Sequence, residues 1–162
     1  MSTLIPVDAI DLKLLDELQR DASRSNQAIA EAVHVSAATS LRRVKRLTDA
    51  SVIERTVAIL SPEALGHGLT AIVEITLDRQ GAEGLSAFES RVAADAAVQQ
   101  CYRVSPGPDF VLVVQVADMP GYHALVQRLF THDANVRNVK AYFSVHRAKF
   151  DPRIALPAPS KA

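Results

Sequence analysis

Hydrophobic residues in the N-terminal third of the chain recur at helical spacing, beginning with Ile10, Leu14 and Leu18. Residues three and four positions apart share one face of a helix, so this spacing predicts a helix over residues 8–19. Asp8 stands at its start, where a carboxylate can accept hydrogen bonds from the first helical turn. Asp11 belongs to the polar positions of this helix and is expected to face water.

Two further helices are predicted after a polar interruption. Ser25 or Asn26 can cap a second helix that continues to Val33. Residues 34–35 leave room only for a turn, after which Ser36 can cap a third helix. Three helices whose last two are joined by so short a turn predict a helix-turn-helix, with the third as the recognition helix.

The third helix, residues 36–47, has two unlike faces when each residue advances the helix by ~100°. Its hydrophobic face is expected to enter a core and consists of Ala37, Leu41, Val44 and Leu47. Its polar side is expected to contact DNA through Ser36, Ala38, Thr39, Arg42, Arg43, Lys45 and Arg46. We expect Ala38, Thr39, Arg42 and Arg46 to face the major groove, with Arg43 and Lys45 on phosphates. The competing interpretation is a three-helix bundle whose basic side chains form only a solvated face.

The second half of the chain alternates between strand-like and helix-like patterns. The expected order is strand, helix, strand, strand, helix, strand, over residues 70–77, 84–94, 98–104, 110–116, 119–131 and 136–147. This βαββαβ order predicts a ferredoxin-like sandwich in which two helices cover one face of a four-stranded antiparallel sheet. The fold class is therefore α+β, with a helix-turn-helix domain of winged-helix type before it. The uncovered sheet face needs a partner, so we expect a dimer.

Turn-forming residues mark the expected boundaries between these parts. Residues 52–60 have the β-branched content of a strand, and Pro62, Gly66 and Gly68 follow it. We expect a helix-turn-helix domain, a linker strand with a hinge, a sheet domain and an extended, proline-rich tail, over residues 1–51, 52–68, 69–150 and 151–162.

Composition adds a constraint on how DNA could be bound. The 162 residues are 48% hydrophobic and 22% charged, as in soluble globular proteins. No hydrophobic run approaches the ~20 residues of a membrane span and no signal peptide is evident, so we expect a cytoplasmic protein. Lys plus Arg number 18 and Asp plus Glu number 18, which leaves a net charge of zero. A neutral monomer attracts DNA weakly over distance, so tight binding is expected to need an oligomer that repeats the recognition helix.

Other chemistry has little support in the sequence. The five histidines are scattered, and neither a nucleophile motif nor a glycine-rich phosphate loop is recognisable. We therefore expect no metal, no cofactor and no catalytic residue. Cys101 is the single cysteine, which excludes an internal disulfide, and it is expected to be a small buried side chain.

Several stretches together carry a family resemblance. They are DAIDLKLLDELQRDAS with SNQAIAEAVHVS, then LRRVKRLTDASVI, and then CYRVSPGPDFVLVVQVADM with VRNVKAYFSVHRAK. In order, spacing and domain length, the chain from Val7 to Pro157 resembles the Lrp/AsnC family of leucine-responsive and feast/famine regulators. The resemblance implies a transcription regulator that binds double-stranded DNA and assembles as dimers and often octamers. It also implies a small-molecule effector, typically an amino acid, held between the sheet domains.

The loop that the resemblance assigns to the effector departs from the family pattern. Effector-binding positions are implied at Ser105, Pro106, Gly107, Asp109, Phe110 and Tyr142. Pro106 stands where the family usually has glycine and removes a backbone N–H that could hold a carboxylate. Asp109 could pair with an effector ammonium group or could cap the turn. Tyr142 could line the pocket or could belong to the core.

Two other functions compete with that of an effector-responsive regulator. One is an effector-independent, DNA-wrapping architectural protein of the same fold, which Pro106 and Pro108 favour. The other is a metabolic ligand-binding or regulatory subunit whose basic helix is only surface. Binding to genomic DNA fragments that falls steeply with salt would exclude the second alternative.

Overall fold

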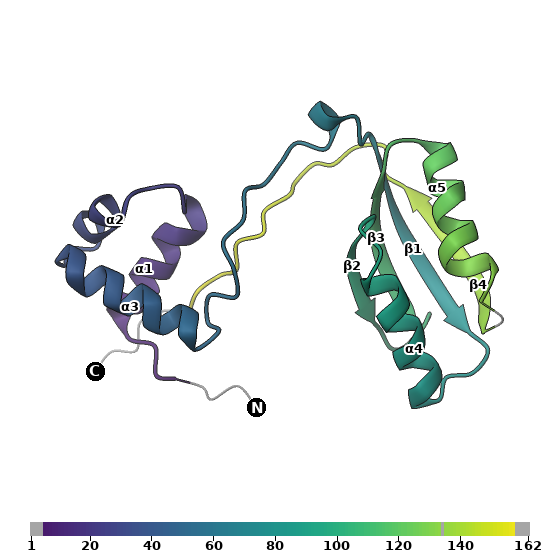
Figure 1. The fold of residues 1–162 in the computed structure, drawn as a ribbon, viewed down its shortest axis with the longest axis horizontal. Helices are drawn as coiled ribbons and strands as arrows, with labels where there is room; N and C mark the ends of the chain where they lie inside the picture. The colour runs from purple at the N-terminus through teal and green to yellow at the C-terminus, as the bar shows by residue number, and fades with distance from the viewer. Residues whose placement is uncertain (1–4, 134, 158–162) are drawn as a thin grey trace. The chain divides into compact units, whose positions relative to one another are not determined.

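The structure is a computed structural model that describes residues 5–133 and 135–157, and its chain divides into two compact units (Figure 1). The first contains Met1–Ile59 with Lys149–Ala162, and the second contains Leu60–Ala148. The chain therefore passes between the units twice. In the part of the chain that the structure describes, no helix is both long enough and apolar enough to cross a membrane.

The first unit is built on three capped helices, α1 (Ala9–Arg20), α2 (Asn26–Ala32) and α3 (Ala37–Asp49). Asp8 caps α1 by accepting hydrogen bonds from the backbone N–H groups of Ile10 and Asp11, both at 2.9 Å. Ser25 and Ser36 cap the next two helices. All three predicted helices are therefore present, and α3 extends two residues beyond its predicted end.

The core of the first unit is small and contains a charged group. Its buried hydrophobic residues are Leu14, Leu15, Ile29, Ala30, Val33 and Leu47. Asp11 is fully buried beside them, so its predicted exposure to water is wrong. The backbone N–H of Asp8 donates to its carboxylate at 3.0 Å, and Arg43 and Arg46 cover it. A carboxylate can be buried when such donors replace the hydrogen bonds of water.

The orientation of α3 about its axis also differs from the prediction. Leu41 was expected in the core, but it is 61% exposed, whereas Ser40 is fully buried. The inner face consists of Ser40 and Leu47, with Val44 half-buried between them. The ion pairs of Arg43 and Arg46 with Asp11 draw that side of α3 toward α1, and they carry Leu41 outward.

The segments that join the units have no regular structure. Residues 52–60 form no strand, because their described backbone N–H groups make no ladder bonds. Between residues 60 and 69, where the sheet begins, the only regular element is a short 3-10 turn, Glu63–Leu65. The C-terminal segment returns to α1, where Gln19 holds Ile154 through two hydrogen bonds. The Ile154 N–H donates to Gln19 Oε1 at 2.8 Å, and Gln19 Nε2 donates to the Ile154 carbonyl at 3.2 Å.

The second unit has the predicted βαββαβ order. Its elements are β1 (Leu69–Leu77), α4 (Ala82–Ala93), β2 (Val98–Arg103), β3 (Phe110–Val116), α5 (Met119–Val126), a π-helical turn (Gln127–Thr131) and β4 (Val136–Phe143). The antiparallel strands lie in the order β2-β3-β1-β4, and α4 and α5 cover one face of the sheet (Figure 1). The α+β, ferredoxin-like prediction is confirmed. β4 ends earlier than predicted because β1 begins at Leu69, which leaves no partner beyond the bond from Ser144 N–H to the Thr70 carbonyl.

Alternation along the strands separates the two faces of this sheet. The helix-covered face is closed by aromatic packing, with the rings of Phe88 and Phe110 only 4.8 Å apart. The opposite face carries Ile72, Tyr102 and Tyr142, which are 44%, 53% and 43% exposed. One of the two sequence interpretations placed Tyr142 in the core, and its exposure shows that this interpretation is wrong. Glu74 and Lys140 lie on the same face, and no described element of this unit covers it.

Candidate nucleic-acid interface

The turn before α3 is held by hydrogen bonds to both of its ends. The Ser36 hydroxyl accepts from the Thr39 N–H at 3.2 Å and donates to Thr39 Oγ1 at 2.9 Å. Asn26, at the start of α2, donates through Nδ2 to the Ala37 carbonyl at 2.8 Å. His34 adopts a φ of 60°, the left-handed conformation that closes the short turn. The first turn of α3 is therefore rigidly placed against α2.

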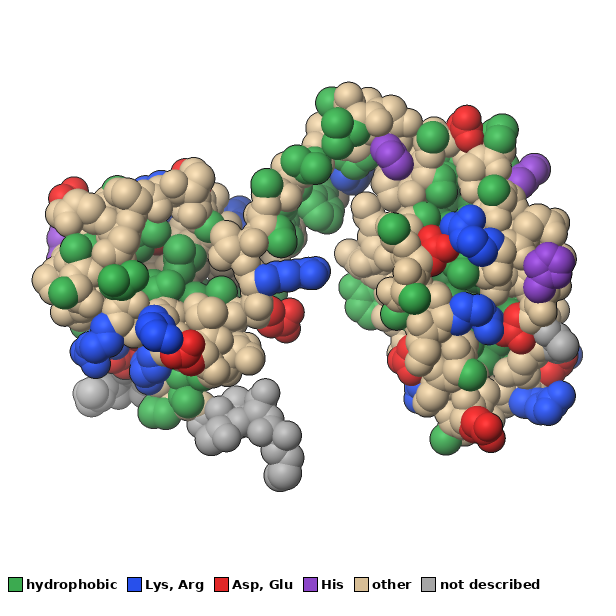
Figure 2. Space-filling model, viewed as in Figure 1, with side chains coloured by type: hydrophobic (Ala, Val, Ile, Leu, Met, Phe, Trp, Pro, Cys, Tyr) green, Lys and Arg blue, Asp and Glu red, His purple; other side chains and the backbone are tan. Residues whose placement is uncertain are grey.

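The outer face of α3 is basic. Figure 2 shows Lys and Arg side chains gathered on the part of the first unit that carries this helix. Within residues 5–133 and 135–157, the exposed Arg42 has no hydrogen-bond or ion-pair partner. Lys45 pairs with Asp49 at 2.9 Å, but both side chains are more than 60% exposed. Such a solvated pair is worth well under ~1 kcal/mol, so Lys45 remains available to another anion.

Arg43 is engaged inside the protein. Its Nη1 atom lies 2.6 Å from Asp8 Oδ2 and 2.9 Å from Asp11 Oδ1. These carboxylates raise the pKa of the Arg43 guanidinium above its usual value, mainly through the hydrogen bond to Asp8. The pKa of Asp8 is lowered, first by the backbone N–H of Asp11 and then by Arg43. The side chain of Arg43 is only 19% exposed, so the structure gives it a role in joining α1 to α3.

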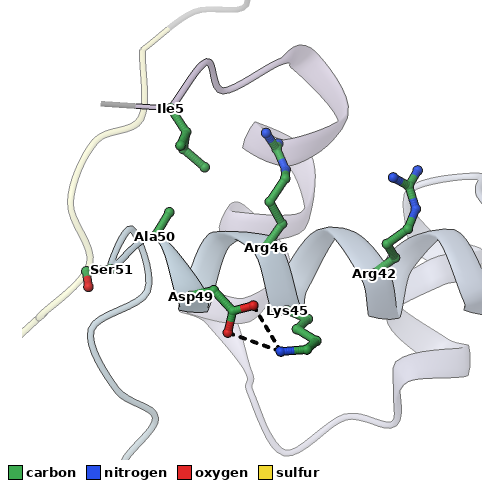
Figure 3. Close-up of a pocket in the computed structure, with 7 residues that line it drawn as sticks. All are labelled: Ile5, Arg42, Lys45, Arg46, Asp49, Ala50 and Ser51. Atoms are coloured by element: carbon green, nitrogen blue, oxygen red, sulfur yellow. Dashed lines mark hydrogen bonds and ion pairs between the residues drawn. The ribbon is translucent and has the colours of Figure 1, made fainter. Parts of the chain in front are cut away.

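Arg46 is intermediate between the exposed Arg42 and the internally bonded Arg43. Its guanidinium bonds to the buried Asp11 carboxylate and donates to the Pro6 carbonyl at 3.2 Å, yet its side chain is 39% exposed. A shallow cavity of about 610 Å³ is lined by Ile5, Arg42, Lys45, Arg46, Asp49, Ala50 and Ser51 (Figure 3). In that view the guanidinium groups of Arg42 and Arg46 extend to the same side of α3, whereas Lys45 turns toward Asp49. Such a cationic groove can accept phosphate oxygens.

Apart from the partly engaged Arg46, the helix-turn-helix positions expected at DNA fall into two groups. Ala38, Arg42 and Lys45 are exposed on the outer face, with Thr39 half-buried beside them. The Ser36 side chain is used as a cap, and Arg43 is used as a tie to α1. The sequence interpretation missed Asp11 and Leu41. The spacing of Asp8 and Asp11 at the start of α1 is a capping-box pattern, which could have indicated that Asp11 turns inward.

The loop implied for an effector lies at one end of the sheet. Asp109 accepts a hydrogen bond from the Leu77 N–H at 2.7 Å and another from Gln80 Nε2 at 3.4 Å. Its carboxylate therefore ties this loop to the end of β1. The Ser105–Pro106 peptide bond is cis, and Gly107 has a φ of 122°, which favours glycine.

The structure does not bring all the implied effector residues together within one chain. Phe110 is fully buried in the core. Tyr142 pairs with Ile72 on β1, whereas Asp109 contacts Leu77, five residues further along that strand. Five residues of strand span ~17 Å, so Tyr142 and the loop lie well apart within one chain.

Two other sequence expectations concern reactive groups. Cys101 is half-buried and packs against the sheet core. Burial, with a smaller contribution from the charge of Glu89, raises the pKa of its thiol, and this lowers the fraction of reactive thiolate. Within the described ranges, no three His, Cys, Asp or Glu side chains are grouped so that they could hold a metal ion.

A tightly turned helix-turn-helix with a basic outer face, followed by a ferredoxin-like sheet, defines a class of proteins, the DNA-binding regulators with a separate ligand-binding domain. The chain matches the model of the AsnC-type helix-turn-helix domain over residues 7–48 and that of the Lrp/AsnC ligand binding domain over residues 70–154. The chain belongs to the Lrp/AsnC family and is a helix-turn-helix transcription regulator.

Similar proteins support this assignment along nearly the whole chain. A leucine-responsive regulatory protein of Rhizobium meliloti (strain 1021) is 34% identical over 149 residues, which cover 92% of this chain and 96% of that protein. The DNA-binding transcriptional activator DecR of Escherichia coli (strain K12) is 35% identical over 144 residues, covering 89% and 95%. The transcriptional regulator NMB0573 of Neisseria meningitidis, solved as an L-Met complex, superposes with a TM-score of 0.86 at 25% identity, covering 93% and 97%.

Proposed function

We propose that this regulator binds double-stranded DNA through the outer face of α3, with Arg42 as the principal side chain in the major groove. The observation that carries the proposal is that Arg42 is exposed on a helix fixed by a tight turn and has no partner among the described residues. Arginine can donate two hydrogen bonds to a guanine edge. Lys45 and Arg46 flank it and can neutralise phosphates.

Arg43 has a different role in this proposal. Because Asp8 and Asp11 already hold its guanidinium, its contribution is to position α3 against α1. Its sequence assignment to a phosphate stays a prediction, and the same holds for the Ser36 side chain.

Replacing Arg42 with alanine tests the DNA-contacting face. We expect Arg42→Ala to weaken binding to the operator by about tenfold or more at fixed salt, because one bidentate base contact is worth ~1–3 kcal/mol. Fluorescence anisotropy with an operator recovered from genomic fragments measures the affinity. Arg20→Ala is the matched control, because Arg20 is an exposed cation on α1 that pairs with Asp16. Equal affinity of the Arg42 variant and the unmodified protein would contradict the proposal.

We further propose that a small molecule of the amino-acid class binds between sheet units of different chains. The family model for residues 70–154 and the L-Met complex of the Neisseria protein support this. The carboxylate of Asp109 already bonds to the Leu77 N–H, so its role in this chain is to order the loop around Ser105 and Gly107. A thermal-shift screen of amino acids is the test, since a ligand at a hundred times its Kd stabilises the folded state by ~2.7 kcal/mol.

The absence of any stabilising amino acid would favour the architectural alternative. Pro106 supports that alternative, because it leaves the loop without one backbone donor. In either case we propose a non-catalytic role in the cytoplasm.

We propose that the active species is a homodimer that assembles further, to an octamer. The support is the uncovered face of the sheet, where Ile72, Tyr102 and Tyr142 expose apolar surface. A neutral chain also needs repeated recognition helices for tight binding. Sedimentation velocity should show dimers or larger species for the unmodified protein. Ile72→Glu should lower the mass, because it places a charge in an apolar interface, and an unchanged mass would contradict a dimer through this face.

A further inference from the structure

We propose that Leu41 reads thymine, by packing its side chain against the 5-methyl group of that base in the major groove. The inference rests on the proposed DNA-binding role of α3 and adds a determinant of sequence preference to it. The sequence pattern had assigned Leu41 to the core, so its outward position is known only from the structure.

The burial pattern of α3 places Leu41 on the outside of its unit. Its side chain is 61% exposed, while Ser40 and Leu47 on the inner face are fully buried. Residues three and four positions apart on a helix are neighbours, so Leu41 lies beside Ala38 and Lys45, and Arg42 follows it in sequence. Ala38 and Lys45 are exposed as well. A large hydrophobic side chain therefore stands on the basic outer face of the recognition helix.

The charges around Leu41 indicate what can cover it. Arg42 and Lys45 would face their own counterparts if a second copy of this face packed on the first, and like charges across an interface repel. A polyanion is attracted by the same two cations. The major groove of DNA is ~12 Å wide and admits an α-helix, so it brings apolar groups on base edges to the helix surface. DNA is therefore the occupant that both the charges and the shape of this face fit.

The chemistry of leucine selects the base. Leucine has no polar atom, so it cannot read the hydrogen-bonding groups of guanine, adenine or cytosine edges. Thymine is the base that presents a methyl group in the major groove. The position of Leu41 in the second turn of α3 keeps it near the N-terminal part of the helix, where a recognition helix contacts bases. The expected preference is thymine over uracil or cytosine at one position in each half-site.

A comparison of thymine with uracil isolates the methyl contact. An operator recovered from genomic fragments is synthesised as a series of variants. Each variant replaces thymine with uracil at one position of the half-site, in both half-sites. The unmodified protein should lose about three- to tenfold in affinity at one such position, the range that burial of one methyl group gives. Leu41→Ala should bind the thymine operator with a similar loss and should no longer distinguish thymine from uracil there.

Leu65→Ala provides the matched control, because Leu65 is also 61% exposed but lies in the 3-10 turn of the second unit. This variant should retain the preference for thymine. The inference is overturned if Leu41→Ala keeps the full preference, or if no thymine replacement weakens the unmodified protein. Failure of the unmodified protein to bind any DNA fragment at low salt would instead overturn the proposed function itself.

Discussion

The two units of this chain are stabilised in different ways. Among the residues that the structure describes, the sheet unit has one cluster of fourteen buried residues, which includes Phe88, Phe110 and Phe130. The main cluster of the helical unit contains three buried residues, Leu14, Ile29 and Val33. Small units bury a smaller fraction of their surface, so they depend more on other interactions. Here those interactions are helix caps, the Asp11 network and the returning C-terminal segment.

This difference has a functional consequence for the recognition helix. Arg43 and Arg46 lie on the side of α3 that meets Asp11, and they hold the helix in place. The outer face of α3 carries the exposed side chains of Leu41, Arg42 and Lys45, and Lys45 has only a solvated pair with Asp49. The helical unit thus uses part of its positive charge for its own stability.

The largest expected effect concerns the core of the sheet unit. Phe88→Ala removes a ring that is 1% exposed and packs on Phe110, and it should lower the free energy of unfolding of that unit by ~3–5 kcal/mol. Urea unfolding followed by circular dichroism measures the loss. Leu65→Ala is the control at an exposed site and should change stability by less than ~0.5 kcal/mol. Similar effects of both variants would show that the hydrophobic cluster does not dominate this unit.

The ionic network of the helical unit should give the next largest effect. Asp11→Ala leaves Arg46 without its buried acceptor and Arg43 with one fewer, and it should destabilise that unit by ~3 kcal/mol. Asp16→Ala, on the same helix, removes only an exposed pair with Arg20 and should cost less than ~1 kcal/mol. Chemical denaturation of both variants gives the comparison. If Asp11→Ala is as mild as Asp16→Ala, the helical unit does not depend on this network.

The docking of the C-terminal segment should have a smaller effect. Gln19→Ala removes both hydrogen bonds to Ile154, and a net hydrogen bond contributes ~1 kcal/mol. We expect trypsin to cleave after Arg153 about five- to thirtyfold faster in this variant, as mass spectrometry of timed digests would show. Gln27→Ala, which breaks only an exposed bond to Glu31, should leave the cleavage rate unchanged. Unchanged cleavage in the Gln19 variant would mean that the segment is held by other contacts.

The smallest expected effect is a pH dependence within the sheet unit. A hydrogen bond from Arg128 lowers the pKa of Asp95, with a further contribution from the Ala97 N–H. The folded state therefore binds this proton less readily than the unfolded state, and stability from Asp95 is present above the unfolded pKa of ~3.9 and lost as pH falls through the folded pKa. Asp95→Asn should flatten the acid limb of the stability curve below about pH 5 by at most ~1 kcal/mol. An unchanged acid limb would contradict this assignment.

Much of the fold could be predicted from local signals. Asp8, Ser25 and Ser36 each combine a capping side chain with a following hydrophobic period, and all three helices begin where these residues stand. The strand Phe110–Val116 was predicted to the residue, because an apolar run bounded by turn residues is unambiguous. The segment 52–60 has the composition of a strand but forms none, since a strand requires a partner that composition does not supply.

The sequence by itself determined the helix-turn-helix, the βαββαβ order and membership in the Lrp/AsnC family, because caps, hydrophobic periods and element spacing are properties of the chain alone. Only the tertiary structure decided which side of α3 faces outward. The hydrophobic spacing of α3 is compatible with more than one rotation of the helix about its axis. The rotation that is adopted depends on Asp11, which lies more than thirty residues earlier and pairs with Arg43 and Arg46. That long-range ion pairing exposes Leu41 and leaves Arg42 unpaired among the described residues.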